Sequence, residues 1–396
     1  MRYQPLLFVG LSLAAAACTG ATPTPTPGDA SGLTTPTPVH DRVAPDPNAV
    51  PSVDTTKRTV ELEDVVFDTF DGSFVRLSDA DSTTVRRLRD LIRPIYNPEY
   101  DTVGAARSWL SDDDRVIGVA VDEGAFAYPV RTLVFREIVN EQFGGTPVAV
   151  TFCPLCVSGV VFDRRVDGRT LLFGNTSALY DNDMVMYDHE TGSYWHQVSG
   201  RAIVGELAGA AMDLVPSLIA TFAEWRALHP DTRVLSNAKA QLARSPDPSE
   251  RMKAAANQGR FAFPVTEQAT SDRRLPLGAE VLEVLVGGEA KAYALADVRK
   301  APANDRVGGR PVVVFGSDDA IAAYVASVNG RELTFEAAPS SAFTAFADRE
   351  TGSTWDLAGR ATAGELEGVS LELVPARRGL WFAIAGSRPG VALFER

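Results

Sequence analysis

The chain has 396 residues, and its 51 Asp and Glu residues outnumber 38 Lys and Arg residues, which gives a formal net charge of -13 and a pI near 4.9. Such an acidic protein repels phosphates, so the charge argues against nucleic acids as partners and against peripheral binding to anionic lipid. Its length exceeds that of the usual single domain, so we expect two packed units.

The first residues are typical of an export signal. Met1 and Arg2 precede an apolar stretch that ends in four alanines directly before Cys18. This stretch is shorter than the about 20 apolar residues that a membrane helix needs. We therefore expect residues 1–17 to be a removed signal peptide, and Cys18 to carry the lipid that anchors an extracytoplasmic lipoprotein to a membrane. Simple cleavage in the alanine run, which would release a secreted protein, is the alternative.

The segment after Cys18 is predicted to be a spacer. Residues 18–58 are dominated by Thr, Pro, Gly and Asp and include the run Thr22 to Pro27. Too few apolar side chains are present for this segment to form a core, and its prolines keep it extended. We expect residues 59–113, with a helix from Ser82 to Ile92, to pack on the unit that follows.

An internal repeat organises the rest of the chain. The run Asp188-His-Glu-Thr-Gly-Ser-Tyr-Trp195 recurs as Asp348-Arg-Glu-Thr-Gly-Ser-Thr-Trp355, and Gly-Arg-Ala, Gly-Glu-Leu and Leu-Val-Pro follow both at matching spacing. Collinear matches of this kind indicate two copies of one unit. We place repeat 1 at 114–236, a connector at 237–278 and repeat 2 at 279–396. The shared Trp residues are predicted to lie in the core, and the shared Asp residues to cap turns.

The local patterns favour strands over helices. Short β-branched or aromatic runs predict strands at Val116–Val121, Val148–Phe152, Val157–Phe162 and Thr170–Phe173. Asp167-Gly168 is a hairpin signal. Further helices are predicted at Thr132–Gln142 and Ser217–Leu228. The predicted fold is α+β and β-rich, with two copies of an antiparallel-sheet unit packed together.

The feature that distinguishes repeat 1 is Thr151-Phe-Cys-Pro-Leu-Cys156, because repeat 2 has Val314-Phe-Gly-Ser-Asp318 instead. A disulfide that closes so short a loop restricts the unfolded chain by only roughly 2 kcal/mol, so stapling is a weak reason for the pair. Cys153 and Cys156 are therefore candidate redox partners or metal ligands.

Two further residues are candidate ligands beside the cysteines. His196 and Met184 stand where repeat 2 has Asp356 and Thr344. Two thiolates with a thioether or an imidazole suit copper, and two thiolates with an imidazole also suit zinc. Core packing is the alternative for Met184, and a surface position on a strand is the alternative for His196.

Several of these runs together resemble one bacterial and archaeal family, the domain of unknown function 3179. The resemblance rests on Val148 to Cys156, Asp183-Met-Val-Met-Tyr-Asp188 and Glu137-Ile-Val-Asn140. It implies a fold but no settled activity. Relatives usually have a histidine where this chain has Arg136, so the implied partner of the thiols is missing. A cation at Arg136 could instead lower the pKa of a thiol and favour redox chemistry.

Three classes of function stay open at this point. In a thiol-redox protein Cys153 and Cys156 would form a reversible pair, and in a metal-binding protein they would be ligands. A non-catalytic binding or scaffold lipoprotein would use neither thiol chemically. The protein or small-molecule partner and the substrate cannot be read from these patterns.

Overall fold

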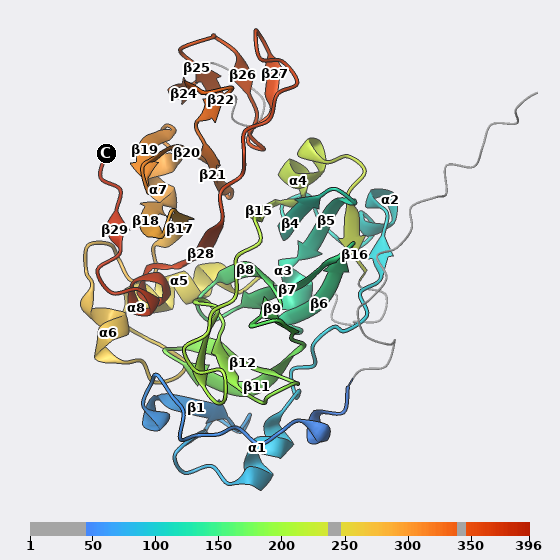
Figure 1. The fold of residues 1–396 in the computed structure, drawn as a ribbon, viewed down its shortest axis with the longest axis vertical. Helices are drawn as coiled ribbons and strands as arrows, with labels where there is room; N and C mark the ends of the chain where they lie inside the picture. Colours follow the sequence, from blue (N-terminus) through green and yellow to red (C-terminus); the bar gives the residue numbers. More distant parts are fainter. Residues whose placement is uncertain (1–44, 237–246, 339–345) are drawn as a thin grey trace, which may run out of the picture. The chain divides into compact units, whose positions relative to one another are not determined.

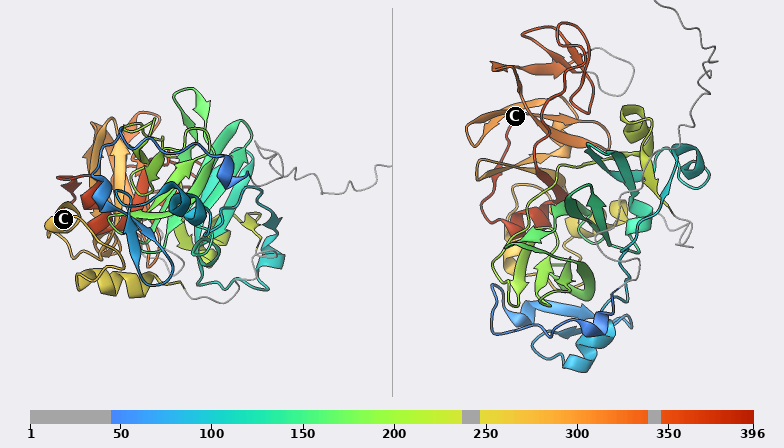
Figure 2. Two further views of the ribbon diagram at one scale, coloured as in Figure 1. Left: turned by 90° about the horizontal axis from the view of Figure 1, so that it is seen from below. Right: turned by 45° about the vertical axis from the view of Figure 1, so that its right-hand side comes forward.

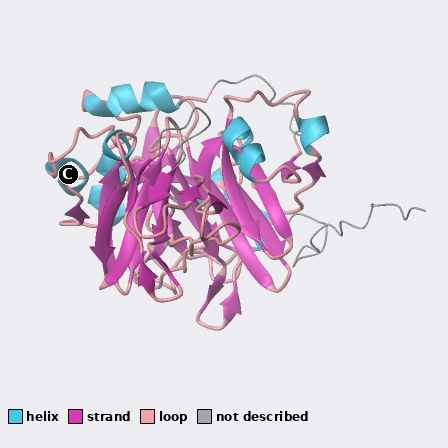
Figure 3. Cartoon of the chain, turned by 90° about the horizontal axis from the view of Figure 1, so that it is seen from above, coloured by secondary structure: helices cyan, strands magenta, loops and turns pink. Residues whose placement is uncertain are grey.

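The computed structural model describes residues 45–236, 247–338 and 346–396. The expected signal peptide, Cys18 and most of the expected spacer lie outside the described residues. The described part of the chain is an α+β fold rich in antiparallel strands, as predicted. In Figure 3 the strands make up the bulk of the fold. Among the described residues, no helix is both long and apolar enough to cross a membrane.

Three sheets contain most strands of the first half of the chain (Figure 1). The six-stranded sheet has the order β14 (Arg201–Val204), β13 (Tyr194–His196), β12 (Asp183–Asp188), β11 (Phe173–Tyr180), β1 (Val65–Asp68) and β2 (Phe74–Arg76). The five-stranded sheet has the order β15 (Leu218–Thr221), β4 (Arg115–Val121), β5 (Gly124–Pro129), β16 (Arg233–Leu235) and β3 (Tyr100–Asp101). The seven-stranded sheet has the order β29 (Ala392–Leu393), β18 (Glu289–Ala294), β17 (Glu280–Val286), β28 (Ala376–Leu380), β8 (Ser158–Asp163), β7 (Thr146–Cys153) and β6 (Ile138–Phe143).

The remaining strands form smaller sheets and ribbons. They are β19 (Ala303–Val307), β20 (Arg310–Gly316) and β21 (Ile321–Val325); β24 (Phe335–Ala337), β25 (Phe346–Asp348), β26 (Thr354–Trp355) and β27 (Ala361–Ala363); and the ribbons β9 (Arg165–Val166) with β10 (Arg169–Thr170) and β22 (Ser327–Val328) with β23 (Arg331–Glu332). The β9–β10 ribbon confirms the predicted hairpin, since Asp167 and Gly168 both have positive φ, as a type I′ turn requires.

The helices are short. They are α1 (Ser82–Leu88), α2 (Val103–Ala106), α3 (Val130–Leu133), α4 (Phe222–Leu228), α5 (Ser249–Asn257), α6 (Glu267–Ser271), α7 (Leu295–Val298) and α8 (Trp381–Ser387), with 3-10 turns at Pro47–Ala49 and Leu62–Asp64. Helix α1 confirms the start of the helix predicted at Ser82–Ile92 but ends at Leu88, and it begins where the Asp81 carboxylate accepts a hydrogen bond from Thr84 N at 2.7 Å.

Two helix predictions are wrong in part. The expected helix Thr132–Gln142 ends at Leu133, and Ile138 to Phe143 form β6, which pairs with β7. The backbone turns at Glu137, whose φ of 56° is incompatible with a helix. The expected helix from Ser217 begins only at Phe222, because Thr221 and Glu224 form a capping box there and the preceding residues pair with β4.

The motif that suggested a repeat makes the same contacts in both places. Trp195 Nε1 donates a hydrogen bond to Asp188 Oδ2 at 2.8 Å, and Trp355 Nε1 donates to Asp348 Oδ2 at 2.9 Å. Both indoles are fully buried, and both aspartates also bind the turn that follows them, as predicted. These are local agreements. That the two whole segments are copies of one unit stays a prediction, as do the domain boundaries, and superposition of the two segments is the test.

Strands from distant parts of the chain meet in the seven-stranded sheet. Strand β28 pairs with β8 through Arg378 and Gly159, and the two lie side by side in Figure 1. A Cβ on Gly159 would lie 2.6 Å from Ile219 Cδ1, so a larger residue here would displace the Ile219 side chain of β15. Near the start of the described residues, β1 pairs with β11, and the blue strands lie next to the green strands in Figure 2. The six-stranded and seven-stranded sheets together position the cysteine turn.

Candidate functional site

The two cysteines lie at the end of β7 and in the turn that follows it. Cys153 is the last residue of β7, and Cys156 lies two residues before Ser158, the first residue of β8. Their side chains lie 3.5 Å apart, and both are free thiols. Cys153 is 1% exposed and Cys156 is 0% exposed. The turn therefore brings two thiols together in a place that bulk solvent does not reach.

A carboxylate from another sheet completes the cluster. Asp183, the first residue of β12, is fully buried, and its Oδ1 accepts a hydrogen bond from Cys156 Sγ at 2.9 Å. One possible ligand atom from each of Cys153, Cys156 and Asp183 lies within 4.8 Å of the others. Sequence reasoning missed Asp183 because it is distant in the chain and begins an ordinary strand.

A network of neutral polar side chains lies beside Cys156. The Cys156 thiol is 3.1 Å from Ser158 Oγ, and that hydroxyl donates to Gln197 Oε1 at 2.5 Å. Gln197 Nε2 in turn donates to Thr151 Oγ1 at 2.8 Å. All of these side chains are buried. A fully connected buried network of this kind holds its members in fixed orientations.

The surroundings of the thiols keep them protonated. Burial raises the pKa of Cys153, and the nearby acidic groups Asp183 and Glu137 raise it further. Burial raises the pKa of Cys156 well above its ordinary value, and Cys153 and Asp183 act in the same direction. A thiol is a nucleophile or a metal ligand only as the thiolate. Both cysteines are thus weak nucleophiles and weak metal ligands for as long as they stay protonated.

Arg136 is not among the main groups that set the pKa of either thiol, so its expected role stays a prediction. We expected this cation to lower the pKa of a thiol, but the charged groups that act most on both thiols are acidic. Arg136 lies in the turn between α3 and β6, where its Nη1 donates to Arg93 O at 3.3 Å. Burial lowers its own pKa. The predicted helix ends at Leu133, before it reaches Arg136.

The other two predicted ligands, His196 and Met184, lie beside the cluster. His196 Nε2 is 3.1 Å from Asp183 Oδ2, close enough for an ion pair if the ring is protonated, although the angle does not make a hydrogen bond. His196 Nδ1 lies 3.1 Å from Ser199 Oγ. Met184 Sδ accepts a weak hydrogen bond from Asn175 Nδ2 at 3.4 Å. His196 therefore contacts the carboxylate, and Met184 lies on the same strand as that carboxylate.

A cavity of about 220 Å³ lies against the cluster. Cys153, Glu137 and Met184 are among the residues that line it. Burial raises the pKa of Glu137 to about 8, and Asn175 Nδ2 donates to its Oε2 at 2.6 Å. Glu137 and Val157 both have positive φ, which is rare for residues with side chains and most unusual for a β-branched one. Backbone strain of this kind gathers at functional sites.

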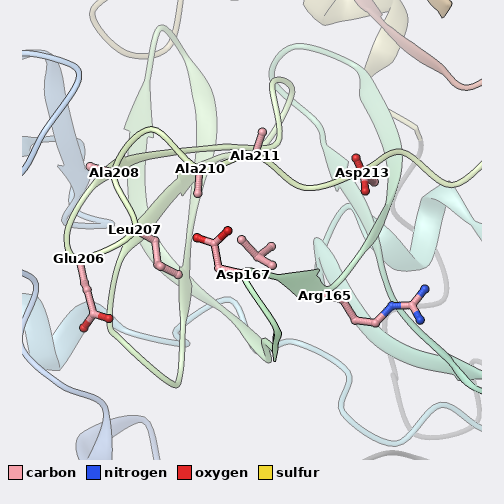
Figure 4. Close-up of a pocket in the computed structure, with 9 residues that line it drawn as sticks. Arg165, Asp167, Glu206, Leu207, Ala208, Ala210, Ala211 and Asp213 are labelled. Atoms are coloured by element: carbon pink, nitrogen blue, oxygen red, sulfur yellow. The ribbon is translucent and has the colours of Figure 1, made fainter. Parts of the chain in front are cut away.

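A second hollow, of about 430 Å³, is more open (Figure 4). It is lined by the β9–β10 turn and by residues 206–213, and Asp167, Glu206 and Asp213 give it an acidic character. None of the predicted site residues lines it. The cysteine cluster, with its own cavity, is thus the better candidate site.

Fold and site together define a β-rich α+β protein with a buried cluster of two thiols and one carboxylate. A family model matches residues 89–390, so the chain belongs to the family described as protein of unknown function, DUF3179. The predicted resemblance is confirmed. No curated protein and no solved structure shows significant similarity to this chain.

Proposed function

We propose that this protein binds a thiophilic divalent metal ion, zinc in the first place, through Cys153, Cys156 and Asp183. The observation that supports this is the convergence of their ligand atoms within 4.8 Å in a buried position. Thiolate and carboxylate ligands with an adjacent imidazole are a set that zinc accepts, whereas a carboxylate is a poor ligand for cuprous copper.

Binding of a metal ion would change the protonation and the charge of the cluster. Each thiol loses its proton when it becomes a ligand, so binding of one dication to the cluster releases two protons. Two thiolates and one carboxylate carry three negative charges, and the dication neutralises most of that charge in the buried site. Three protein ligands leave a fourth position for water or a substrate, as in catalytic zinc sites.

Metal analysis of the purified protein, followed by cobalt titration, tests this proposal. We expect one metal ion per chain, and thiolate-to-cobalt charge-transfer bands when cobalt replaces it. Cys153→Ser, Cys156→Ser and Asp183→Asn should each weaken affinity by roughly 100-fold or more, since even outer partners of a metal site contribute 10–100-fold. Affinity should rise with pH, because protons compete with the metal.

Asp188→Asn is the matched control. Asp188 and Asp183 are the two ends of β12 and both are fully buried, but Asp188 binds Trp195 and the following turn. This substitution should lower stability and leave the metal content unchanged. A parent protein without bound metal, or an equal loss of metal in the control, would contradict the proposal.

Thiol redox chemistry is a second candidate, and the 3.5 Å separation of the side chains favours it. Oxidation to a disulfide removes two electrons and two protons from the pair, and a small oxidant would have to accept them, because burial keeps protein partners away. A thiol count before and after oxidant, with and without metal, separates the two proposals. If the pair neither binds metal nor forms a disulfide, the binding or scaffold reading remains.

We also propose the cell-envelope location expected from the first residues of the chain. Its support is the apolar stretch and alanine run before Cys18. Cys18→Ala should move the protein from the membrane fraction to the soluble fraction. Unchanged membrane association of that variant would remove the lipoprotein proposal.

In an oxidising compartment a free dithiol would tend to form a disulfide, so bound metal would also protect the cysteine pair from oxidation.

We propose further that the second repeat is a degenerate partner that supports the first. In this segment β20 ends at Gly316 and β21 begins at Ile321, and the turn between them contains no cysteine. Ser317 closes that turn by donating its N–H to Ala320 O at 2.8 Å. We expect metal binding to depend on the first segment alone, so that Ser317→Ala leaves the metal content unchanged.

A further inference from the structure

We propose that the cavity beside Cys153 binds a small uncharged organic molecule, with an apolar body and one hydrogen-bonding group, as the ligand or substrate of this site. The position of that molecule next to a metal rests on the proposed function, whereas its binding in the cavity does not. The argument uses the walls of the cavity, its charge and its size.

The walls are mainly apolar and come from distant parts of the chain. Phe70 belongs to the β1–β2 turn, Ile92 follows α1, Val134 follows α3, Leu179 lies on β11 and Phe263 lies between α5 and α6. Binding sites for small molecules are typically apolar clefts with a few convergent polar groups. Here the polar groups are those of Asp68, Glu137, Asn175 and Ser177.

The residues between the two cysteines take part in the same wall. Cys153, Pro154 and Leu155 line the cavity, whereas Cys156 is directed toward Asp183 and Ser158. A metal site needs only the cysteines of this turn. The turn therefore joins the cluster and the cavity, and a molecule in the cavity would contact the Cys153 side of the cluster.

The charge of the cavity selects against anions. Asp68 and Glu137 bring carboxyl groups to the lining, and the described lining residues include no Lys, Arg or His. A carboxylate or phosphate would enter an apolar and acidic space without a cation to pair with, which is costly. A hydroxyl group, in contrast, can both donate to and accept from the side chains of Glu137 and Asn175.

The size of the cavity limits the ligand. Its volume of about 220 Å³ exceeds the ~150 Å³ of an engineered apolar cavity that holds benzene. A single ring with one short polar substituent therefore fits. Phe70 is 50% exposed, so at least one wall residue is open to solvent.

Benzyl alcohol and benzoate are the probes, since they share the ring and differ in charge. We expect calorimetry or protein NMR to show that benzyl alcohol binds at least tenfold more tightly than benzoate. Leu179→Ala should enlarge the cavity. This variant should bind naphthalenemethanol more tightly, relative to benzyl alcohol, than the parent does. Asn175→Leu should weaken benzyl alcohol by roughly tenfold, which corresponds to the loss of about 1.4 kcal/mol.

Asn140→Leu is the control for Asn175→Leu. Asn140 is a buried asparagine on β6 that binds the backbone of Phe173 and does not line the cavity. Equal binding of the two probes, or equal losses in the two asparagine variants, would overturn the proposal.

The double variant Cys153→Ser, Cys156→Ser separates this proposal from the metal proposal. Benzyl alcohol should still bind to it, within about threefold of the parent. In the cobalt-loaded parent, benzyl alcohol should change the visible spectrum. Binding without any spectral change would keep the ligand site and overturn its position beside the metal.

Discussion

Glu141 is a buried carboxyl group whose ionisation opposes folding. Burial raises its pKa to about 8, although Gln142 N and nearby tyrosine hydroxyls donate hydrogen bonds to it. An unfolded glutamate has a pKa near 4.5. Between these two values the folded state binds more protons than the unfolded state, so the free energy of unfolding falls as pH rises.

We therefore expect stability to fall between about pH 5 and pH 8, by at most about 1.4 kcal/mol per pH unit from this group. Glu141→Gln should make that fall shallower, and Glu137, whose pKa moves in the same direction, should account for part of what remains. Urea unfolding at a series of pH values measures how the free energy of unfolding changes with pH. Glu206→Gln, at an exposed ion pair with Arg169, should leave the slope unchanged. A stability that rises across this window would contradict the expectation.

Single residues also show where sequence reasoning succeeded and failed. Trp195 and Asp188 were predicted as core and turn residues because their types and spacing recur, and a local motif carries its own hydrogen bonds. Asp183 was missed because its importance comes from contact with Cys156, 27 residues away. His189, inside the same motif, packs against Tyr187 and lies 3.1 Å from the Tyr96 hydroxyl.

Strands β17 and β28 are joined by buried ion pairs as well as by their backbone hydrogen bonds. Glu283 is fully buried and contacts both Arg377 and Arg388. Arg377 is 3% exposed, and its Nη1 also donates to Val198 O of the first segment at 2.7 Å. Loss of one partner of a buried pair leaves an uncompensated charge.

Arg377→Met should therefore lower the free energy of unfolding by about 3–5 kcal/mol. Arg310→Met is the control, because its pair with Glu372 is exposed and such pairs contribute about 0–1 kcal/mol. Denaturant unfolding of both variants gives the comparison. Similar losses in the two would show that the buried pair has no special role in joining these strands.

The helix predicted at Thr132–Gln142 gives way to strand β6 because of strand pairing. Residues 132–142 contain an apolar spacing that suits a helix, yet Ile138 and Val139 pair with Thr151 and Val150 of β7. β-Branched residues pack well in a sheet, and a free strand edge beside them decides the outcome. That edge belongs to a strand later in the chain, so the local pattern does not reveal it.

The largest hydrophobic cluster of the described residues includes side chains from both halves of the chain. It contains Val148, Val160 and Trp195 of the first segment together with Trp381 and Ile384 of α8. A second cluster joins Trp225 to Phe315 and Trp355. Neither half therefore buries its apolar surface alone.

We expect a fragment of residues 45–236 to lack native tertiary structure. Its β8 would lose β28 as a neighbour, and apolar surface now covered by α8 would be exposed. Near-ultraviolet circular dichroism and binding of a hydrophobic dye provide the measurements. The control is residues 45–396, which should unfold in one cooperative transition. A native-like spectrum from the fragment would show that the first segment folds independently.

The sequence by itself determined what depends on neighbours along the chain. Alternating β-branched and aromatic runs, Asp-Gly turns and the Trp-containing motif indicated an antiparallel, β-rich α+β fold, and the combined motifs identified the family. The paired cysteines, present in only one segment, indicated where chemistry was to be sought. These inferences hold because backbone propensity and hairpin geometry act over a few residues.

Only the tertiary structure decided what surrounds the two thiols. It placed Asp183 beside Cys156, joined Cys153 to a cavity, and directed Arg136 toward the Arg93 carbonyl. It also decided that the thiol pKa values rise, since burial removes the water that would stabilise a thiolate. Burial and electrostatic contact depend on which distant strands meet, and that meeting depends on the packing of the whole chain.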